Sequence, residues 1–370
     1  MSGVSPIEDI IDDARNGKPF ILVDADDREN EGDIIIPAQF ATPERVNQMA
    51  LHARGLICLA LSAQRARDLQ LEQMSSDNRS GHGTAFTVSI EAADGVTTGI
   101  SAYDRARTIS VAINPACGAD DLVTPGHVFP LVARDGGVLI RAGHTEAAVD
   151  ISRLAGLTPA GVICEVMNDD GTMARLPDLI PFAKKHGMKI GTIADLIAYR
   201  RKSEKLVEKV AEAPFETHFG DHFTIHVYRD LIDHGEHVAL VRKRIHEGEV
   251  TLVRVHQVDL TADVLGFKSA HRNYVPRMLQ QIAQHDGPSV AVFVRDPDRQ
   301  SLSRRVKGGR REYASQYGSR DYGIGAQILQ DLGVSRMNLL TSSSTKMAAL
   351  EGFGLEVVGR TAVAPEKEDD

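Results

Sequence analysis

The sequence contains no tryptophan and only three cysteines among 370 residues, and its aromatic content is 5%. Cys58, Cys117 and Cys164 show no paired spacing, so we expect free thiols in a reducing compartment and no disulfide framework. No apolar run approaches the roughly 18 residues of a membrane span, and the N-terminus lacks a basic stretch followed by an apolar one. The sequence therefore predicts a cytoplasmic protein without a membrane partner.

An excess of positive charge is also missing, because the formal net charge is −9 at pH 7. This balance argues against nucleic acid as the main partner. The length of 370 residues and the 42% of hydrophobic residues are typical of a globular protein with two domains. A charged stretch without glycine, residues 199–216, separates two different patterns, and we interpret it as a helix end that passes into a linker.

The patterns on the two sides of this stretch both favour an α/β fold. Residues 1–199 alternate apolar, strand-like runs with helical stretches and glycine-rich turns. After the stretch, the segments HFTIHVY, EHVALVRK and VTLVRVH alternate apolar and polar residues, which predicts short strands.

An acidic stretch, DDRENEGD at residues 26–33, lies between two apolar runs that predict strands. Six acids fall within ten residues of the chain: Asp24, Asp26, Asp27, Glu29, Glu31 and Asp33. A solvated turn is one interpretation, but crowded carboxylates repel one another unless a cation offsets the repulsion. Oxygen ligands without a nearby cysteine suit Mg²⁺ or Mn²⁺. Arg28 is placed to pair with a neighbouring acid or to hold a substrate phosphate.

A second informative stretch is GGVLIRAGHTEAAVD, residues 136–150. We predict that VLI is a strand, that a helix follows it, and that Thr145 is the N-cap. Small residues at a helix N-terminus favour an anion site, to which Arg141 adds positive charge. His144 is either a metal ligand or a capping or solvated side chain. Farther on, Glu165 interrupts the apolar run GVICEV; it needs a partner if it is buried, and the alternative is an exposed strand face.

Four segments in series carry a family resemblance: DDRENEGD, TTGISAYDRA (97–106), TPGHVFPLVARDGGVLIRAGHTEAAVD (124–150) and GVICEVMNDDG (161–171). Over about residues 5–200 the chain resembles 3,4-dihydroxy-2-butanone 4-phosphate synthase of riboflavin biosynthesis. That family converts ribulose 5-phosphate to 3,4-dihydroxy-2-butanone 4-phosphate and formate. The resemblance implies a lyase (EC 4.1.99.12) that uses Mg²⁺ or Mn²⁺ without an organic cofactor and works as a homodimer. It also implies a three-layer synthase domain with a mixed sheet, residues 1–205.

The same resemblance implies roles for individual residues. Glu29 and His144 match metal ligands, and Glu31 is expected to help hold the metal or its waters. The positions that match catalytic residues are His127, Glu165 and Asp33. The positions that match substrate contacts are Arg28, Glu29, Asp33, Glu165 and the run Arg141, Ala142, Gly143, His144 and Thr145, of which the run is expected near the phosphate. Cys58 and Thr98 resemble pocket-lining residues.

The second half resembles GTP cyclohydrolase II over roughly residues 214–360, through segments such as VRVHQVDLTADVLGF. That family needs a Zn²⁺ held by three cysteines, and the matching positions here are Asp259, Ala270 and Arg272. No cysteine follows Cys164. The resemblance therefore implies a cyclohydrolase II-like α/β domain, residues 212–363, with neither zinc nor cyclohydrolase activity.

Two alternatives remain for the second half. In the first, the protein is bifunctional and also hydrolyses GTP, with histidines such as His218, His222 and His226 forming a new metal site. In the second, this half senses a nucleotide or a flavin and regulates the first domain. The basic segment RQSLSRRVKGGRR, residues 299–311, is then a candidate anion site or docking surface, although a solvated loop is the plainer interpretation.

Overall fold

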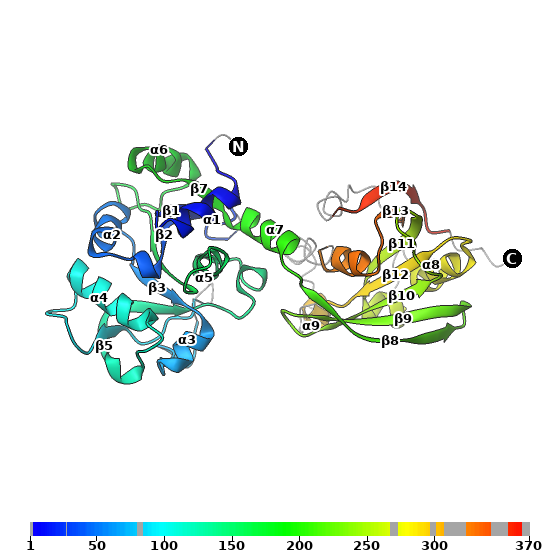
Figure 1. Cartoon of the computed structure of the whole chain (residues 1–370), viewed down its shortest axis with the longest axis horizontal. Coiled ribbons are helices and arrows are strands. Elements are labelled where there is room, and N and C mark those ends of the chain that lie inside the picture. Colours follow the sequence, from blue (N-terminus) through cyan, green and yellow to red (C-terminus); the bar gives the residue numbers. More distant parts are fainter. Residues whose placement is uncertain are drawn as a thin grey trace. The chain divides into compact units, whose positions relative to one another are not determined.

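The structure is a computed structural model, and it describes residues 3–26, 28–79, 84–266, 273–296, 301–306, 323–341 and 354–364. The chain divides into two compact units, Met1–Arg200 and Arg201–Asp370. Each unit has a mixed sheet and helices (Figure 1), so the expected α/β class is confirmed. Among the described helices, none has both the length and the apolar character that a membrane crossing requires.

The first unit is built on a seven-stranded sheet of order β4-β5-β3-β6-β2-β1-β7. Its strands are β1 (Phe20–Val23), β2 (Gly32–Pro37), β3 (Cys58–Leu61), β4 (Ile90–Ala92), β5 (Leu122–Val132), β6 (Ala160–Glu165) and β7 (Ile190–Thr192). The pairs β1–β7 and β3–β5 are parallel, and the other neighbouring pairs are antiparallel. The sheet is therefore mixed, as expected.

Helices cover both faces of this sheet, because strand residues point alternately to the two sides. Phe20 and Leu22 of β1 pack with α1 (Ile7–Arg15), α5 (His144–Leu154) and α7 (Ile193–Ser203). Ile21 and Val23 pack with α2 (Pro43–Gln48), α4 (Ala102–Ile113) and α6 (Leu176–His186). The shorter helical elements are η1 (Ala38–Phe40), η2 (Met49–Ala53), α3 (Ala63–Asp68), η3 (Ala119–Asp121) and η4 (Gly137–Leu139). The first unit thus has three layers.

The acidic stretch is the loop of a hairpin between β1 and β2, as predicted. Val23 pairs with Gly32, so residues 24–31 form the loop. Asp33 follows on β2 and lies directly opposite Glu165, the last residue of β6. Antiparallel pairing thus brings the acidic loop, the start of β2 and the end of β6 to one end of the sheet.

The predicted strand before the helix at residue 144 is wrong. Val138 lies in the 3-10 turn η4, and Gly136 and Gly137 before it have φ of 89° and 61°. This left-handed backbone does not continue a strand. The Val138 N–H donates instead to Asp150 of α5 at 2.8 Å. The predicted N-cap is also wrong, because Gly143 caps α5 and Thr145 already lies in its first turn.

The second unit is built on a sheet of order β14-β13-β11-β12-β10-β9-β8. Its strands are β8 (Val207–Thr217), β9 (Gly220–Asp230), β10 (Glu236–Arg242), β11 (Val250–Gln257), β12 (Ser289–Val294), β13 (Arg336–Leu340) and β14 (Glu356–Thr361). The helical elements are η5 (Leu260–Val264), α8 (Tyr274–Gln284), α9 (Ser301–Val306) and a helix over residues 323–331. The strands predicted from HFTIHVY, EHVALVRK and VTLVRVH are confirmed as β9, β10 and β11.

The linker predicted within residues 199–216 is wrong for most of its length. Helix α7 ends at Ser203, and β8 begins at Val207 and pairs antiparallel with β9. Most β8 side chains are exposed. A strand at the edge of a sheet often carries charged residues that discourage pairing with other chains, which explains its linker-like composition.

Candidate active site

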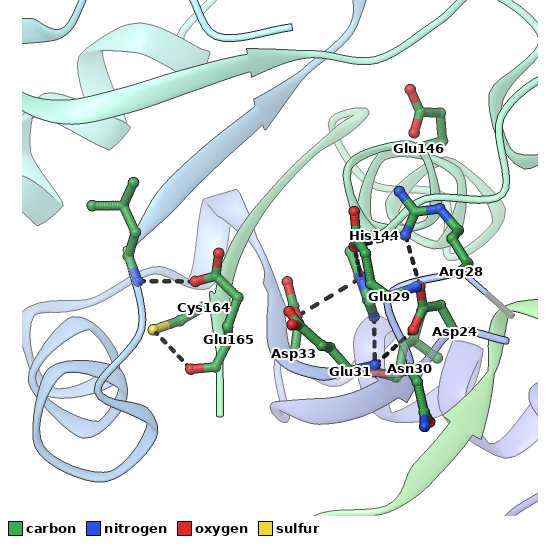
Figure 2. A network of polar contacts seen from close by, with 12 residues as sticks. Asp24, Arg28, Glu29, Asn30, Glu31, Asp33, His144, Glu146, Cys164 and Glu165 are labelled. Atoms are coloured by element: carbon green, nitrogen blue, oxygen red, sulfur yellow. Dashed lines mark hydrogen bonds and ion pairs between the residues drawn. The ribbon is translucent and has the colours of Figure 1, made fainter. Parts of the chain in front are cut away.

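Asp24 organises the acidic loop from inside. Its side chain is buried and accepts the backbone N–H groups of Glu29 and Glu31, at 3.1 and 2.8 Å. Arg28 Nη1 lies 2.8 Å from the same carboxylate. Burial by itself would raise the pKa of Asp24, but the Glu31 N–H, His144, Arg28 and the Glu29 N–H together outweigh it and lower that pKa. Asp24 is therefore an ionised carboxylate around which the loop is folded (Figure 2).

His144, the first residue of α5, faces this loop (Figure 2). Its Nε2 lies 3.2 Å from the carbonyl oxygen of Leu22, so in the neutral ring Nε2 carries the proton and donates it to that carbonyl. The lone pair of Nδ1 then points toward Glu29 Oε2 and Asp33 Oδ1, at 3.9 and 3.8 Å. Burial lowers the pKa of His144, although Asp24 opposes this shift, which favours the neutral ring that binds metals.

Three ligand atoms of a possible metal site converge here. One atom each from Asp24, Glu29 and His144 lies within 4.8 Å of the others. Glu29 Oε2 also accepts from Arg28 Nη1 at 2.7 Å. Within the described part of the chain, Glu31 is not in this group; burial and the neighbouring Glu29 raise its pKa. The structure thus brings Glu29 and His144 together with Asp24, and it places Glu31 beside them.

Asp33 and Glu165 form a pair of carboxyl groups across two strands. Direct partners of this kind have Cβ atoms about 4.5–5.5 Å apart. Asp33 is 3% exposed, and its Oδ1 has no hydrogen-bond partner among the described residues. Burial, and then the charge of Glu165, raise the pKa of Asp33 well above its usual range. Glu165 Oε2 is held by the Leu56 N–H at 2.9 Å. Asp33 is therefore a buried carboxyl group that readily keeps a proton.

A buried acid holds Arg141 at the start of α5. Arg141 Nη1 donates to Glu146 Oε2 at 2.7 Å, and Glu146 is 1% exposed. The other carboxylate oxygen of Glu146 accepts the Arg134 N–H at 3.0 Å. An added Cβ at Gly143 would lie 2.3 Å from Arg141 Nη1, so a larger residue there would displace the guanidinium. The run from Arg141 through Ala142 and Gly143 to Thr145 therefore joins a fixed guanidinium to the N-terminus of a helix, which suits an anion.

The remaining predicted site residues lie outside this polar network. Cys58 is buried on β3, where burial and Glu165 raise the pKa of its thiol. His127 lies on β5, and its Nδ1 is 2.6 Å from Glu91 Oε2. Thr98 is exposed in the loop before α4. Among the described contacts, none joins His127 or Thr98 to Asp24, and the acidic residue Asp27 is not among the described residues.

Sequence reasoning missed several residues that shape the site. Asp24 is one of six acids in this stretch, and nothing in the sequence indicates that its carboxylate accepts hydrogen bonds from the backbone N–H groups of the loop. Glu146 lies two residues after His144, and an acid in the first helical turn beside an arginine was a usable indication. Glu91 contacts His127, and Arg175 contacts the acidic loop. No sequence pattern indicates either contact, because each residue is distant in sequence from its partner.

In the second unit, Asp259 has a structural use. Its Oδ1 accepts the N–H groups of Thr261 and Ala262, at 3.1 and 3.3 Å, and so caps η5. Ala270 and Arg272 lie outside the described residues. Nearby, His256 Nε2 lies 2.8 Å from Asp263 Oδ2, and the His256 ring stacks on Tyr274.

The alternative of a histidine metal site in the second unit finds no support within the described residues. His226 is buried on β9, with Nδ1 3.2 Å from Glu212 Oε2, and His222 lies on the same strand. His218 precedes β9 in the turn after β8. Among the described residues, no group of metal-ligating atoms was found in this unit.

Two family profiles match the chain in series. The profile described as 3,4-dihydroxy-2-butanone 4-phosphate synthase matches residues 8–199. The profile described as GTP cyclohydrolase II matches residues 208–362. All the residues of the acidic loop and of the α5 N-terminus fall within the first match.

Similar proteins share nearly the whole chain. A 3,4-dihydroxy-2-butanone 4-phosphate synthase of Neisseria meningitidis serogroup B is 48% identical over 97% of this chain and 98% of its own. The riboflavin biosynthesis protein RibBA of Aquifex aeolicus is 50% identical over 96% of this chain and 92% of its own.

Two solved structures are also similar. The crystal structure of RibBX, a two-domain 3,4-dihydroxy-2-butanone 4-phosphate synthase from A. baumannii, covers 98% of this chain and 100% of its own, with 42% identity and a TM-score of 0.79. A second synthase, in complex with two magnesium ions, covers 54% of this chain and 98% of its own, with 40% identity and a TM-score of 0.52.

Proposed function

The chain belongs to the 3,4-dihydroxy-2-butanone 4-phosphate synthase family, and we infer from this membership that it catalyses the synthase reaction in riboflavin biosynthesis. In that reaction, ribulose 5-phosphate is converted to 3,4-dihydroxy-2-butanone 4-phosphate and formate by a lyase of class EC 4.1.99.12. We assign the reaction to a first domain over residues 1–205. The observation that carries this assignment is the buried Asp33, opposite Glu165 and beside His144 and Glu29.

The donor set fits a hard divalent cation, Mg²⁺ or Mn²⁺. Carboxylate oxygens and one neutral imidazole suit these ions, and the His144 tautomer is set by the Leu22 carbonyl. We propose Glu29 and His144 as ligands, with Glu31 holding the metal or its waters, and we add Asp24 because its oxygen lies within the same group. A cation bound here would supply Lewis-acid stabilisation of negative charge on substrate oxygens.

The protein's own groups then handle the substrate and its protons. The first chemical step removes a proton from the carbon next to the substrate carbonyl, and Asp33, Glu165 and His127 are the proposed bases and acids. Because burial and Glu165 raise the pKa of Asp33, this carboxyl group can accept a proton and keep it for return in a later step.

We propose that the substrate phosphate binds at the start of α5. Arg141, held by Glu146, would supply a fixed positive charge there. The segment from Ala142 to Thr145 would supply backbone N–H groups, and Arg28 would contact the substrate from the acidic loop. Cys58 and Thr98 remain proposed as pocket-lining residues.

For the second domain, residues 212–363, we propose a cyclohydrolase II-like fold without zinc and without GTP hydrolysis. The support is that Asp259, at the first cysteine position, is engaged as a helix cap. A nucleotide- or flavin-sensing role is the alternative, and a calorimetric titration of the full chain with GTP, FMN and riboflavin tests it.

We also propose a cytoplasmic homodimer. Thr98 and His127 are set apart from the acidic network, and the apolar Ile100 and Tyr103 near Thr98 are 57% and 71% exposed. These exposed apolar side chains are available to pack against a second copy of the chain. Light scattering should give a mass of twice 40.2 kDa, and a mass of 40.2 kDa would contradict the dimer.

A paired assay tests the proposed activity. Ribulose 5-phosphate is supplied with Mg²⁺ and formate is followed, and GTP is supplied with Zn²⁺ and its loss is followed. We expect formate release without loss of GTP. Absence of formate would refute the synthase assignment, whereas GTP turnover would show that the second domain has a metal site of its own.

A further inference from the structure

The backbone of the acidic loop is held from outside as well as from inside. Arg175 lies at the start of α6, after β6, and its Nη1 donates to the carbonyl oxygen of Glu29 at 2.7 Å. The same nitrogen donates to the carbonyl oxygen of Asn30. Asp24 holds the loop's N–H groups and Arg175 holds its carbonyl groups, so the peptide units around Glu29 are bonded on both sides.

The loop conformation at this point needs such support. Asn30 has φ of 53°, in the left-handed region, which only a few residue types adopt readily. Arg175 is itself anchored, because its own N–H donates to Asp178 Oδ2 at 3.0 Å in the first turn of α6. A planar guanidinium on a fixed helix start is well suited to hold two neighbouring carbonyl groups in one place.

We propose that Arg175 is a positioning residue for the metal site: by fixing the carbonyl groups of Glu29 and Asn30, it sets the direction in which the Glu29 carboxylate points toward His144. This inference rests on the proposed function, in which Glu29 and His144 hold a divalent cation. Arg175 itself contacts backbone and not the ligand atoms of the group formed by Asp24, Glu29 and His144.

The charge of Arg175 and its hydrogen bonds affect the cation in opposite directions. Arg175 Nη1 lies 4.0 Å from Glu31 Oε1, so its positive charge partly neutralises the acids that attract a cation. Loss of the charge alone would therefore strengthen cation binding. Loss of the two carbonyl hydrogen bonds would weaken it, because a misdirected ligand binds metal poorly; such supporting groups typically contribute about 10–100-fold in metal affinity.

The chain offers a matched control. Arg65 donates to the carbonyl oxygens of Ala112 and Asn114, at 2.7 Å each, and so holds the backbone at the end of α4 through a guanidinium. It follows the end of β3, whereas the acidic site lies at the end of the sheet where β3 begins. Arg65→Met thus removes the same charge and the same kind of hydrogen bonds far from the proposed metal.

The experiment titrates Mn²⁺ into the full-length wild type, Arg175→Met, Arg175→Lys and Arg65→Met, and follows free Mn²⁺ by electron paramagnetic resonance. We expect about tenfold weaker binding for Arg175→Met, partial recovery for Arg175→Lys, and wild-type binding for Arg65→Met. Hydrogen exchange gives a second measure: the Glu29 and Glu31 amides should lose protection in Arg175→Met and keep it in Arg65→Met.

Binding that is unchanged or tighter in Arg175→Met would overturn the proposal, and so would an equal loss in Arg65→Met. A wild type that binds no Mn²⁺ would also overturn it. Formate release is measured separately: a wild type that binds Mn²⁺ but releases no formate would refute the proposed reaction while leaving the role of Arg175 supported by the binding and exchange data.

Discussion

Asp33→Asn is the substitution that most directly tests the electrostatics of the site. The Asp33 side chain is buried, its Oδ1 has no hydrogen-bond partner among the described residues, and Glu165 lies opposite it. Asparagine keeps the size of the side chain and removes the charge. A buried polar group without a hydrogen bond costs about 1–3 kcal/mol, and more when it is charged; asparagine keeps the polar cost and removes the part that comes from the charge and from repulsion by Glu165. We therefore expect Asp33→Asn to stabilise the first domain by about 1–3 kcal/mol at pH 8 in the absence of metal.

The gain should depend on pH in a defined direction. The pKa of Asp33 is raised in the folded state, so the folded protein binds this proton more tightly than the unfolded chain does. The contribution of protonated Asp33 to the free energy of unfolding is fully present below the pKa of an aspartate in the unfolded chain, about 3.9. It is lost as the pH rises through the raised pKa of Asp33 in the folded protein. The advantage of Asp33→Asn should consequently be largest at pH 8 and smaller at pH 5.

The assay is differential scanning calorimetry of the full chain with a chelator at the two pH values. For a domain of about 200 residues, 1 kcal/mol corresponds to about 2–4 °C in Tm. Formate release should fall by at least about 100-fold, the usual contribution of an acid–base group. Asp150→Asn is the matched control: Asp150 is also buried but lies 2.8 Å from Arg200 Nη1, so its loss should destabilise by about 3–5 kcal/mol. A Tm of Asp33→Asn below that of the wild type at pH 8, or a pH-independent difference, would refute the reasoning.

Three further substitutions test other parts of the structure. Glu146→Gln should release Arg141 and raise the KM for ribulose 5-phosphate about tenfold, with a smaller change in kcat. Steady-state formate release measures both constants, and equal falls in kcat and kcat/KM would argue against a role of Arg141 in substrate binding. Gly55→Ala would place a Cβ 2.4 Å from the Glu165 backbone carbonyl oxygen and 2.6 Å from Glu165 Oε2, so both the backbone and the carboxylate of Glu165 must shift. We expect kcat to fall about 100-fold, and an unchanged kcat would show that Glu165 tolerates displacement. Asp259→Ala removes the cap of η5 and should lower the free energy of unfolding of the second unit by about 1 kcal/mol, measured by calorimetry. Formate release should stay unchanged, and a change in it would link η5 to the activity of the first domain.

The local elements of the chain were largely predictable from short stretches. Apolar runs around DDRENEGD gave β1 and β2 with the acidic loop between them, and alternation gave β9, β10 and β11. Errors occurred where local pattern and tertiary context disagree. The segment VLI consists of strand-forming residues, but it does not form a strand. The Val138 N–H donates to the Asp150 carboxylate, and the left-handed backbone of Gly136 and Gly137 turns the chain before it. Residues 207–217 have the composition of a linker, but pairing with β9 makes them a strand.

The chemical groups of the site and their order could be predicted from the sequence: carboxylates concentrated in one loop, an arginine and a histidine before a helix, and four segments typical of one enzyme family. Which of these groups lie together depends on the folding of the whole domain. Asp33 faces Glu165 because β2 pairs with β6 in one register, and His144 reaches the loop because α5 packs over β1 and β2. Arg175 reaches the carbonyl of Glu29 across 146 positions of sequence. Such contacts depend on strand register and helix packing, which are set by burial over the whole domain and not by any short stretch.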